Sequence, residues 1–175
     1  MQTFLISISG ADRVGVISSV SGTLYDAGVN LADASFAVLG EGFEFSALGE
    51  VEASVGAGDI HAALSALACL EDARISVEPA PYASERLERG AVTHIVEFSG
   101  GDRPGLVARM SEVLQNHNAN IVRMTSRRTE RGGTDDYRTR FAVNVAAAEV
   151  EVLENALFNT AGSLGLACEM NVARP

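Results

Sequence analysis

Two short segments, 90 residues apart, carry residue types that could bind a small zwitterion. Each has the pattern Asp-Arg-x-Gly before an expected helix, with an asparagine fifteen residues after the glycine. Glycine allows close backbone approach, and free N–H groups at a helix N-terminus favour a carboxylate. An aspartate accepts hydrogen bonds from an ammonium group, and an amide both donates and accepts them. These groups together fit an α-amino acid. They are Gly10, Asp12, Gly15 and Asn30 in the first segment and Gly100, Asp102, Gly105 and Asn120 in the second.

The same residues also have purely structural interpretations. Asp12 and Asp102 stand where an N-cap would serve a following helix, and Pro104 fits a first helical turn. The asparagines can simply end a turn. Arg13 and Arg103 can be solvated or paired on the surface. From the residues alone, ligand binding and a structural role both stay open.

The two segments belong to an internal repeat that organises the whole chain. Residues 9–17 align with residues 99–107, and without a gap Ser21 meets Ser111 and Leu24 meets Leu114. Between the copies, two prolines and mixed charge interrupt the periodicity. We therefore predict domains at residues 1–84 and 92–175, joined by a linker at residues 85–91.

Each copy reads as strand, helix, strand, strand, helix, strand. Apolar β-branched runs at residues 4–8 and 92–98 predict first strands, and apolar residues at three-to-four spacing predict helices that end near Gly28 and Asn118. Strict alternation from Phe43 and from Tyr137 predicts strands with one core face. The expected class is α+β, with two ferredoxin-like βαββαβ domains, each a four-stranded antiparallel sheet with two helices on one face. Matching Phe45 to Phe141 gives an offset of 96, which makes the second hairpin about six residues longer, with the excess at residues 129–136.

The pattern Asp-Arg-Val-Gly at residues 12–15 and Asp-Arg-Pro-Gly at residues 102–105, with the asparagine that follows, resembles the ACT domain. The tandem pair is similar to the glycine cleavage system transcriptional repressor family. Val14 departs from the commoner proline in the first copy. The resemblance implies amino-acid binding where two such modules meet, no catalysis, and an effect on another protein. It implies ligand contacts at Asp12, Gly15, Asn30 and Leu31 and at Asp102, Gly105, Asn120 and Ile121. We add Arg13 and Arg103, within the same two loops, as candidate ligand contacts.

The expected function is therefore a non-catalytic regulator that binds a small amino acid such as glycine or serine. We expect a homodimer that acts on a protein partner such as a transcription factor. One alternative is a ligand-free scaffold for dimerisation and interaction. A remote alternative is an acylphosphatase-like enzyme, in which Arg13 would hold phosphate and Asn30 would place water, although Asp12 would repel the phosphate.

Charge is unevenly distributed along the chain. The net charge is −10, with 3 arginines and 13 acidic residues in residues 1–88 and 10 of each in residues 89–175. This excess of acid argues against general affinity for a nucleic acid backbone. Alternation places Arg138 and Arg140, with Arg123 and Arg127, on the outer face of one sheet, and places Glu44 and Glu50 outward in the other copy. We expect an interface between an acidic face and a basic face, with a solvated sheet face or RNA and DNA binding as the alternatives.

The remaining composition predicts neither metal nor cofactor. The three histidines lack the spacing of a metal site, and Cys69 and Cys168 are expected to be buried thiols, not a disulfide. No apolar run approaches the length of a membrane span, and the N-terminus does not read as a signal peptide. We expect a cytoplasmic protein with no membrane partner.

Overall fold

The computed structural model describes residues 1–83, 87–101, 104–131 and 134–174. The chain divides into two compact units, Met1–Glu85 and Arg86–Pro175, and each is described by itself. The first contains β1 (Gln2–Ala11), α1 (Val16–Asp26), β2 (Asn30–Leu39), β3 (Gly42–Val51), α2 (Ala57–Ser65), the 3-10 turn η1 (Ala68–Leu70) and β4 (Arg74–Pro79). The second contains η2 (Glu88–Gly90), β5 (His94–Gly101), α3 (Leu106–Asn116), β6 (Asn120–Arg131), β7 (Thr134–Asn144), η3 (Ala147–Glu149), α4 (Val150–Ser163) and β8 (Ala167–Val172).

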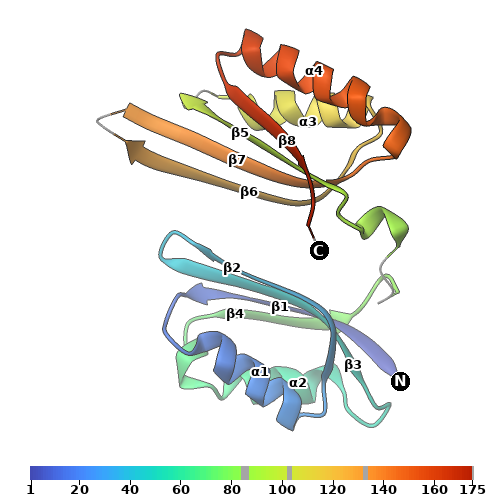
Figure 1. Ribbon diagram of the computed structural model, residues 1–175. Helices are drawn as coiled ribbons and strands as arrows, with labels where there is room; N and C mark the ends of the chain where they lie inside the picture. The colour runs from blue at the N-terminus through green and yellow to red at the C-terminus, as the bar shows by residue number, and fades with distance from the viewer. Residues whose placement is uncertain (84–86, 102–103, 132–133, 175) are drawn as a thin grey trace. The chain divides into compact units, whose positions relative to one another are not determined.

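Each unit is an antiparallel sheet with two helices on one face (Figure 1). The strand orders are β2-β3-β1-β4 and β6-β7-β5-β8, so β2 and β6 are edge strands of their own sheets. This arrangement confirms the predicted α+β fold of two ferredoxin-like domains. No helix among the described residues is long and apolar enough to cross a membrane.

Glycines in the left-handed region start the first helix of each unit. Gly15 (φ 90°) is the N-cap of α1 and Gly105 (φ 88°) is the N-cap of α3. The prediction that Asp12 would be the N-cap was therefore wrong, and Pro104 lies before the cap instead of in the first turn. The predicted helix ends are confirmed, because Gly28 (φ 75°) and Asn118 (φ 52°) both take positive φ just after the helices.

The alternation of apolar residues on the third strand of each unit builds one core per unit. In β3 the side chains of Phe43, Phe45, Ala47 and Val51 are buried, as the sequence predicts. In the second unit the rings of Phe98 and Phe141 pack with centroids 5.6 Å apart and an interplanar angle of 45°. The first core is formed mainly by Phe4, Ile6, Ile8, Val16, Val20, Leu24, Phe43, Phe45, Ile60 and Leu64. The second is formed mainly by Val96, Phe98, Leu106, Met110, Leu114, Phe141, Val143, Leu153 and Leu157.

The strand register corrects the predicted hairpin offset from 96 to 94. Ile8 pairs with Phe45, and its counterpart Phe98 pairs with Thr139, so Phe45 corresponds to Thr139 and not to Phe141. The second hairpin is thus longer by four residues, two on each strand. The error came from matching two phenylalanines by type. The cores have in fact exchanged the positions of large and small residues, since Phe141 takes the place of Ala47.

A second exchange surrounds Gly49, which is buried in β3. A Cβ atom at this glycine would lie 2.5 Å from Val29 Cγ1 and 3.0 Å from Ile6 Cδ1. At the corresponding positions of the second unit the glycine becomes Val143, while Val29 becomes Ala119 and Ile6 becomes Val96. Both neighbours are therefore smaller where the central residue is larger.

Candidate ligand-binding site

The loop between β1 and α1 presents its polar side chains to solvent. Asp12, Arg13 and Val14 are exposed, and neither charged side chain has a hydrogen bond or ion pair with the described residues. The backbone holds the loop, since Asp12 N–H donates to the Glu41 carbonyl at 2.9 Å. The free N–H groups of the first turn of α1 lie directly after this loop and favour an anionic group. The predicted Asp12, Arg13 and Gly15 are thus gathered at one end of the first sheet.

The second copy of the loop is described only in part. Gly105 caps α3, and its carbonyl accepts the Arg109 N–H at 3.0 Å. Asp102 and Arg103, which are predicted ligand contacts, lie outside the described residues.

The repeated glycines at the strand ends have a structural reason for lacking a side chain. A Cβ at Gly10 would lie 2.9 Å from Ala73 Cβ, and one at Gly100 would lie 2.7 Å from Leu166 Cδ2. Such contacts are too short for packed carbon atoms. These two glycines therefore allow close approach within their own domain, which accounts for them without a ligand.

Asn30 lies at the opposite end of the sheet from Asp12. It pairs with Glu50, which pairs in turn with Thr3 near the start of β1. Ala11, at the other end of β1, is eight residues further along, which at ~3.3 Å per residue is about 26 Å. One domain therefore does not bring the two parts of the predicted site together. Leu31, next to Asn30, packs partly against the core of its own domain.

The second domain separates its two parts in the same way. Asn120 pairs with Asn144, which lies beside the start of β5, whereas Gly105 follows the end of that strand. Ile121, the neighbour of Asn120, is partly exposed on the edge strand.

Asn120 and Asn144 bind the turn that leads into β5. Asn120 Nδ2 donates to the Arg89 carbonyl at 2.8 Å. Asn144 Nδ2 donates to the Ala91 carbonyl at 2.8 Å and to the Glu88 carbonyl at 3.3 Å. Asn144 was not predicted, because its counterpart in the first domain is Glu50 and only the corrected offset of 94 aligns the two.

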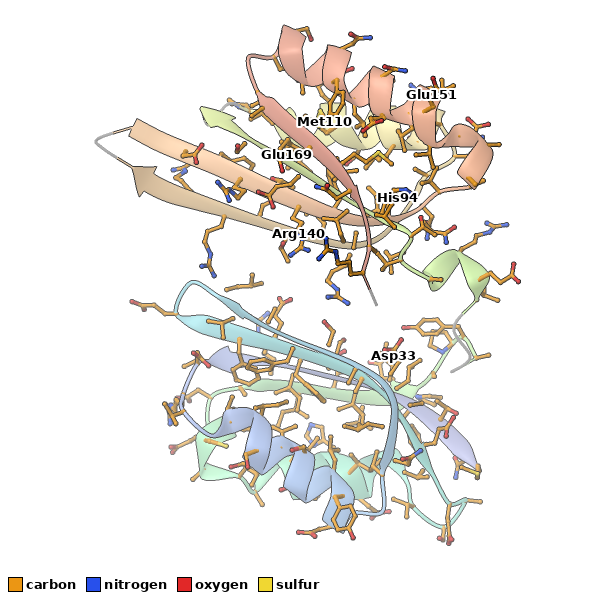
Figure 2. The ribbon with its side chains drawn as sticks, in the orientation of Figure 1. Asp33, His94, Met110, Arg140, Glu151 and Glu169 are labelled. Atoms are coloured by element: carbon orange, nitrogen blue, oxygen red, sulfur yellow. The ribbon has the colours of Figure 1, made fainter. Side chains whose placement is uncertain are left out.

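The predicted interface residues lie on the faces of the sheets that the helices leave uncovered. Figure 2 shows Arg140 on that side of the second sheet. There Arg138 forms an ion pair with Glu97 at 3.2 Å between side chains that are about half exposed or less, a weak contribution to stability. Glu44 corresponds to Arg138 in register, but Glu50 corresponds to Asn144, so one of the two predicted glutamates has an arginine at the equivalent position. Charge also reverses between Asp33 and Arg123, which occupy equivalent positions on β2 and β6.

The uncovered face of the first sheet carries a row of four serines that the sequence did not reveal. Ser35, Ser46, Ser7 and Ser76 lie directly opposite one another across all four strands. They line a shallow hollow of about 400 Å³ with Glu44 and Arg74 at its edge. In a single sequence the four residues are too far apart to be recognised as one row.

Thiols and carboxylates form no metal site in the part of the chain that the structure describes. Both cysteines are free and half-buried. Burial, together with the nearby charges of Glu169 and Glu154, raises the pKa of the Cys168 thiol to about 11. This thiol stays protonated and unreactive near neutral pH.

Comparison with known proteins agrees with the fold. The sequence matches the ACT domain family twice, over residues 2–78 and 94–160. No curated protein sequence matches it significantly. The structure is similar to an unknown protein from Galdieria sulphuraria, with 23% identity, a TM-score of 0.76 and 99% of both chains covered. It is also similar to a proposed glycine cleavage system transcriptional repressor, with 16% identity, a TM-score of 0.72, and 99% of this chain and 98% of that chain covered. The chain belongs to the ACT domain family and contains one ACT domain in each half.

Proposed function

We propose that the chain is a non-catalytic regulatory protein that binds a small α-amino acid, of glycine or serine size, where two ACT domains meet. The observation that carries this proposal is the separation of the two halves of the site. The Asp12 loop and Asn30 are about 26 Å apart in one sheet, and no small amino acid spans that length. A complete site therefore needs the loop of one domain and the asparagine of another.

Edge strand β2 provides a way to join the two halves. Its outer backbone groups have no neighbouring strand in their own sheet, and such an edge readily pairs with another strand. Phe36 and Val38 are also partly exposed on it. If the β2 strands of two chains pair antiparallel, Asn30 of one chain lies beside the Leu39 end, and so the Asp12 loop, of the other. The proposed assembly is a homodimer.

In such a site each part of the zwitterion has a partner. The Asp12 carboxylate accepts from the ammonium group, the first turn of α1 attracts the carboxylate, and Asn30 from the other chain completes the contacts. Arg13 adds positive charge beside the ligand carboxylate. The equivalent set of the second domain is Asp102, Arg103, Gly105, Asn120 and Ile121.

The proposed target is a protein, such as a transcription factor, in the cytoplasm. A net charge of −10 opposes binding to a polyanion. The similarity to a proposed glycine cleavage repressor supports glycine as the first ligand to test. The interface between Glu44 and Glu50 on one side and Arg138 and Arg140 on the other stays a prediction. Glu44→Arg places like charges at this interface and should disrupt it, which light scattering would detect as a lower mass in solution.

A thermal-shift screen against the twenty amino acids tests ligand binding. A ligand at ten times its Kd stabilises the folded state by about 1.4 kcal/mol, which raises the midpoint by several degrees. We expect one or two small amino acids to give this shift, and Asp12→Ala and Asn30→Ala to reduce it to the part that the equivalent site of the second domain supplies. Asp72→Ala and Asn159→Ala, which remove exposed side chains elsewhere, serve as matched controls. A folded protein that no amino acid stabilises would refute the sensor function and leave a ligand-free scaffold.

A further inference from the structure

The turn that precedes β5 in the second domain is held by Asn120, which the proposed function assigns to ligand binding, and by Asn144. The 3-10 turn η2 (Glu88–Gly90) and its C-cap Ala91 are closed by two backbone hydrogen bonds, from Gly90 N–H to the Leu87 carbonyl at 2.7 Å and from Ala91 N–H to the Glu88 carbonyl at 3.0 Å. Three of its carbonyl groups, at Glu88, Arg89 and Ala91, also accept from asparagine side chains at 2.8–3.3 Å. The turn leads directly into β5 (Figure 1).

The chemistry of this contact is that of a carbonyl-binding clamp. Asn120 and Asn144 lie opposite each other on β6 and β7, and their amide N–H groups both point to the backbone of the turn. An amide donor that binds a backbone carbonyl can equally bind the carboxylate of an amino acid. A ligand that uses Asn120 must therefore compete with the turn for the same side chain.

The first domain lacks the second half of this clamp. Asn30 corresponds to Asn120, but its partner across the strands is Glu50, which corresponds to Asn144. A carboxylate only accepts hydrogen bonds and therefore has no hydrogen to donate to a carbonyl. The same end of the sheet is thus built to hold a backbone turn in the second domain only.

We propose that the turn at residues 88–91 is a latch that fills the Asn120–Asn144 clamp, and that an amino acid bound at Asn120 displaces it. The inference rests on the proposed amino-acid binding and adds its regulation. In the latched state the chain is fixed from Glu88 onward. Displacement frees the backbone around Arg89, so ligand binding at this site releases the segment that leads into β5 and thereby transmits the signal.

Trypsin reports on the latch because it cleaves after arginine, and Arg89 lies within the turn. A protease needs an extended, locally opened segment, so the latch slows cleavage of the Arg89–Gly90 bond. Asn144→Ala removes two of the three side-chain hydrogen bonds. We expect cleavage at this bond to accelerate roughly 5- to 30-fold, the factor that corresponds to one or two lost hydrogen bonds. Asn144→Glu, which copies Glu50, should act alike, and Asn159→Ala on α4 should change nothing.

The same trypsin experiment is repeated with glycine, with serine and with any other amino acid that shifts the melting midpoint. We expect the bound amino acid to accelerate cleavage after Arg89 in the wild type. We also expect both Asn144 variants to bind it more tightly by a similar factor, measured by calorimetry. Cleavage after Arg109, in α3, shows whether a variant is still folded, and Asn144→Glu replaces Asn144→Ala if the latter is not.

The outcomes separate the two proposals. Equal affinity in wild type and variants, with cleavage unchanged by ligand, would overturn the latch while leaving amino-acid binding intact. Cleavage that is equally fast in wild type and Asn144 variants without ligand would overturn it as well. If no amino acid binds to any variant, the proposed function and the latch both fall.

Discussion

The packing around Gly49 makes a quantitative prediction about the first domain. A methyl group added at this position would lie 2.5 Å from Val29 Cγ1 and 3.0 Å from Ile6 Cδ1, and both neighbours are buried. Because neither side chain can move into solvent, Gly49→Ala should cost about 1–3 kcal/mol of the free energy of unfolding. Val29→Ala alone removes two methyl groups, at ~0.8 kcal/mol each plus the cavity that they leave.

The double variant Gly49→Ala with Val29→Ala should cost clearly less than the sum of the two single variants. The added methyl group fills the space that valine leaves, as Val143 and Ala119 do in the second domain. We expect a favourable coupling of about 1–2 kcal/mol. The assay is hydrogen exchange in increasing urea, read by mass spectrometry on peptides of β1 and β3. Peptides of β5 and β7 serve as the internal control. A double variant whose cost equals the sum of the two single costs within about 0.5 kcal/mol would refute the packing argument.

Two further predictions concern single residues of the second domain. Gly105→Ala should lower the unfolding free energy by about 1 kcal/mol, because φ is +88° and a Cβ would meet no neighbour, so that backbone strain is the only cost. Gly101→Ala, in equally open space without positive φ, is its control, and equal melting midpoints would contradict the prediction. In a Cys69→Ser background, Cys168 should react with a thiol reagent at pH 8.5 roughly 100-fold more slowly in the folded than in the unfolded protein, because its pKa is raised from 9.0 to about 11. The same shift predicts a loss of stability as pH rises from about 9 to 11, since the unfolded chain releases the proton first; equal reaction rates, or pH-independent stability over that range, would contradict it.

The sequence predicts the order of elements well because that order depends on local periodicity. The alternation from Phe43 and the positive-φ positions Gly28 and Asn118 both follow from local rules, and the structure confirms them. Register depends on pairing between distant strands. Matching Phe45 to Phe141 by type failed there, because the domains had exchanged large and small residues across the core.

The candidate site was harder to predict for a related reason. The sequence shows that Asp12 and Asn30 have suitable side chains for a zwitterion, but only the strand register shows that they lie at opposite ends of the first sheet. Asn120 binds a backbone carbonyl 31 residues earlier in the chain, and Asn144 binds two carbonyls of the same turn, 53 and 56 residues earlier. Contacts of that range carry no local pattern.

The exchange around Gly49 also bears on the history of a duplicated chain. Two similar gene segments tend to recombine, and each exchange makes the copies alike again. Here a crossover between codons 29 and 49 would produce two kinds of hybrid domain. One combines Val29 with Val143 and overfills the core, and the other combines Ala119 with Gly49 and leaves a cavity. Either hybrid domain is less stable than both parents. The complementary packing therefore selects against such hybrids and keeps the two halves free to diverge.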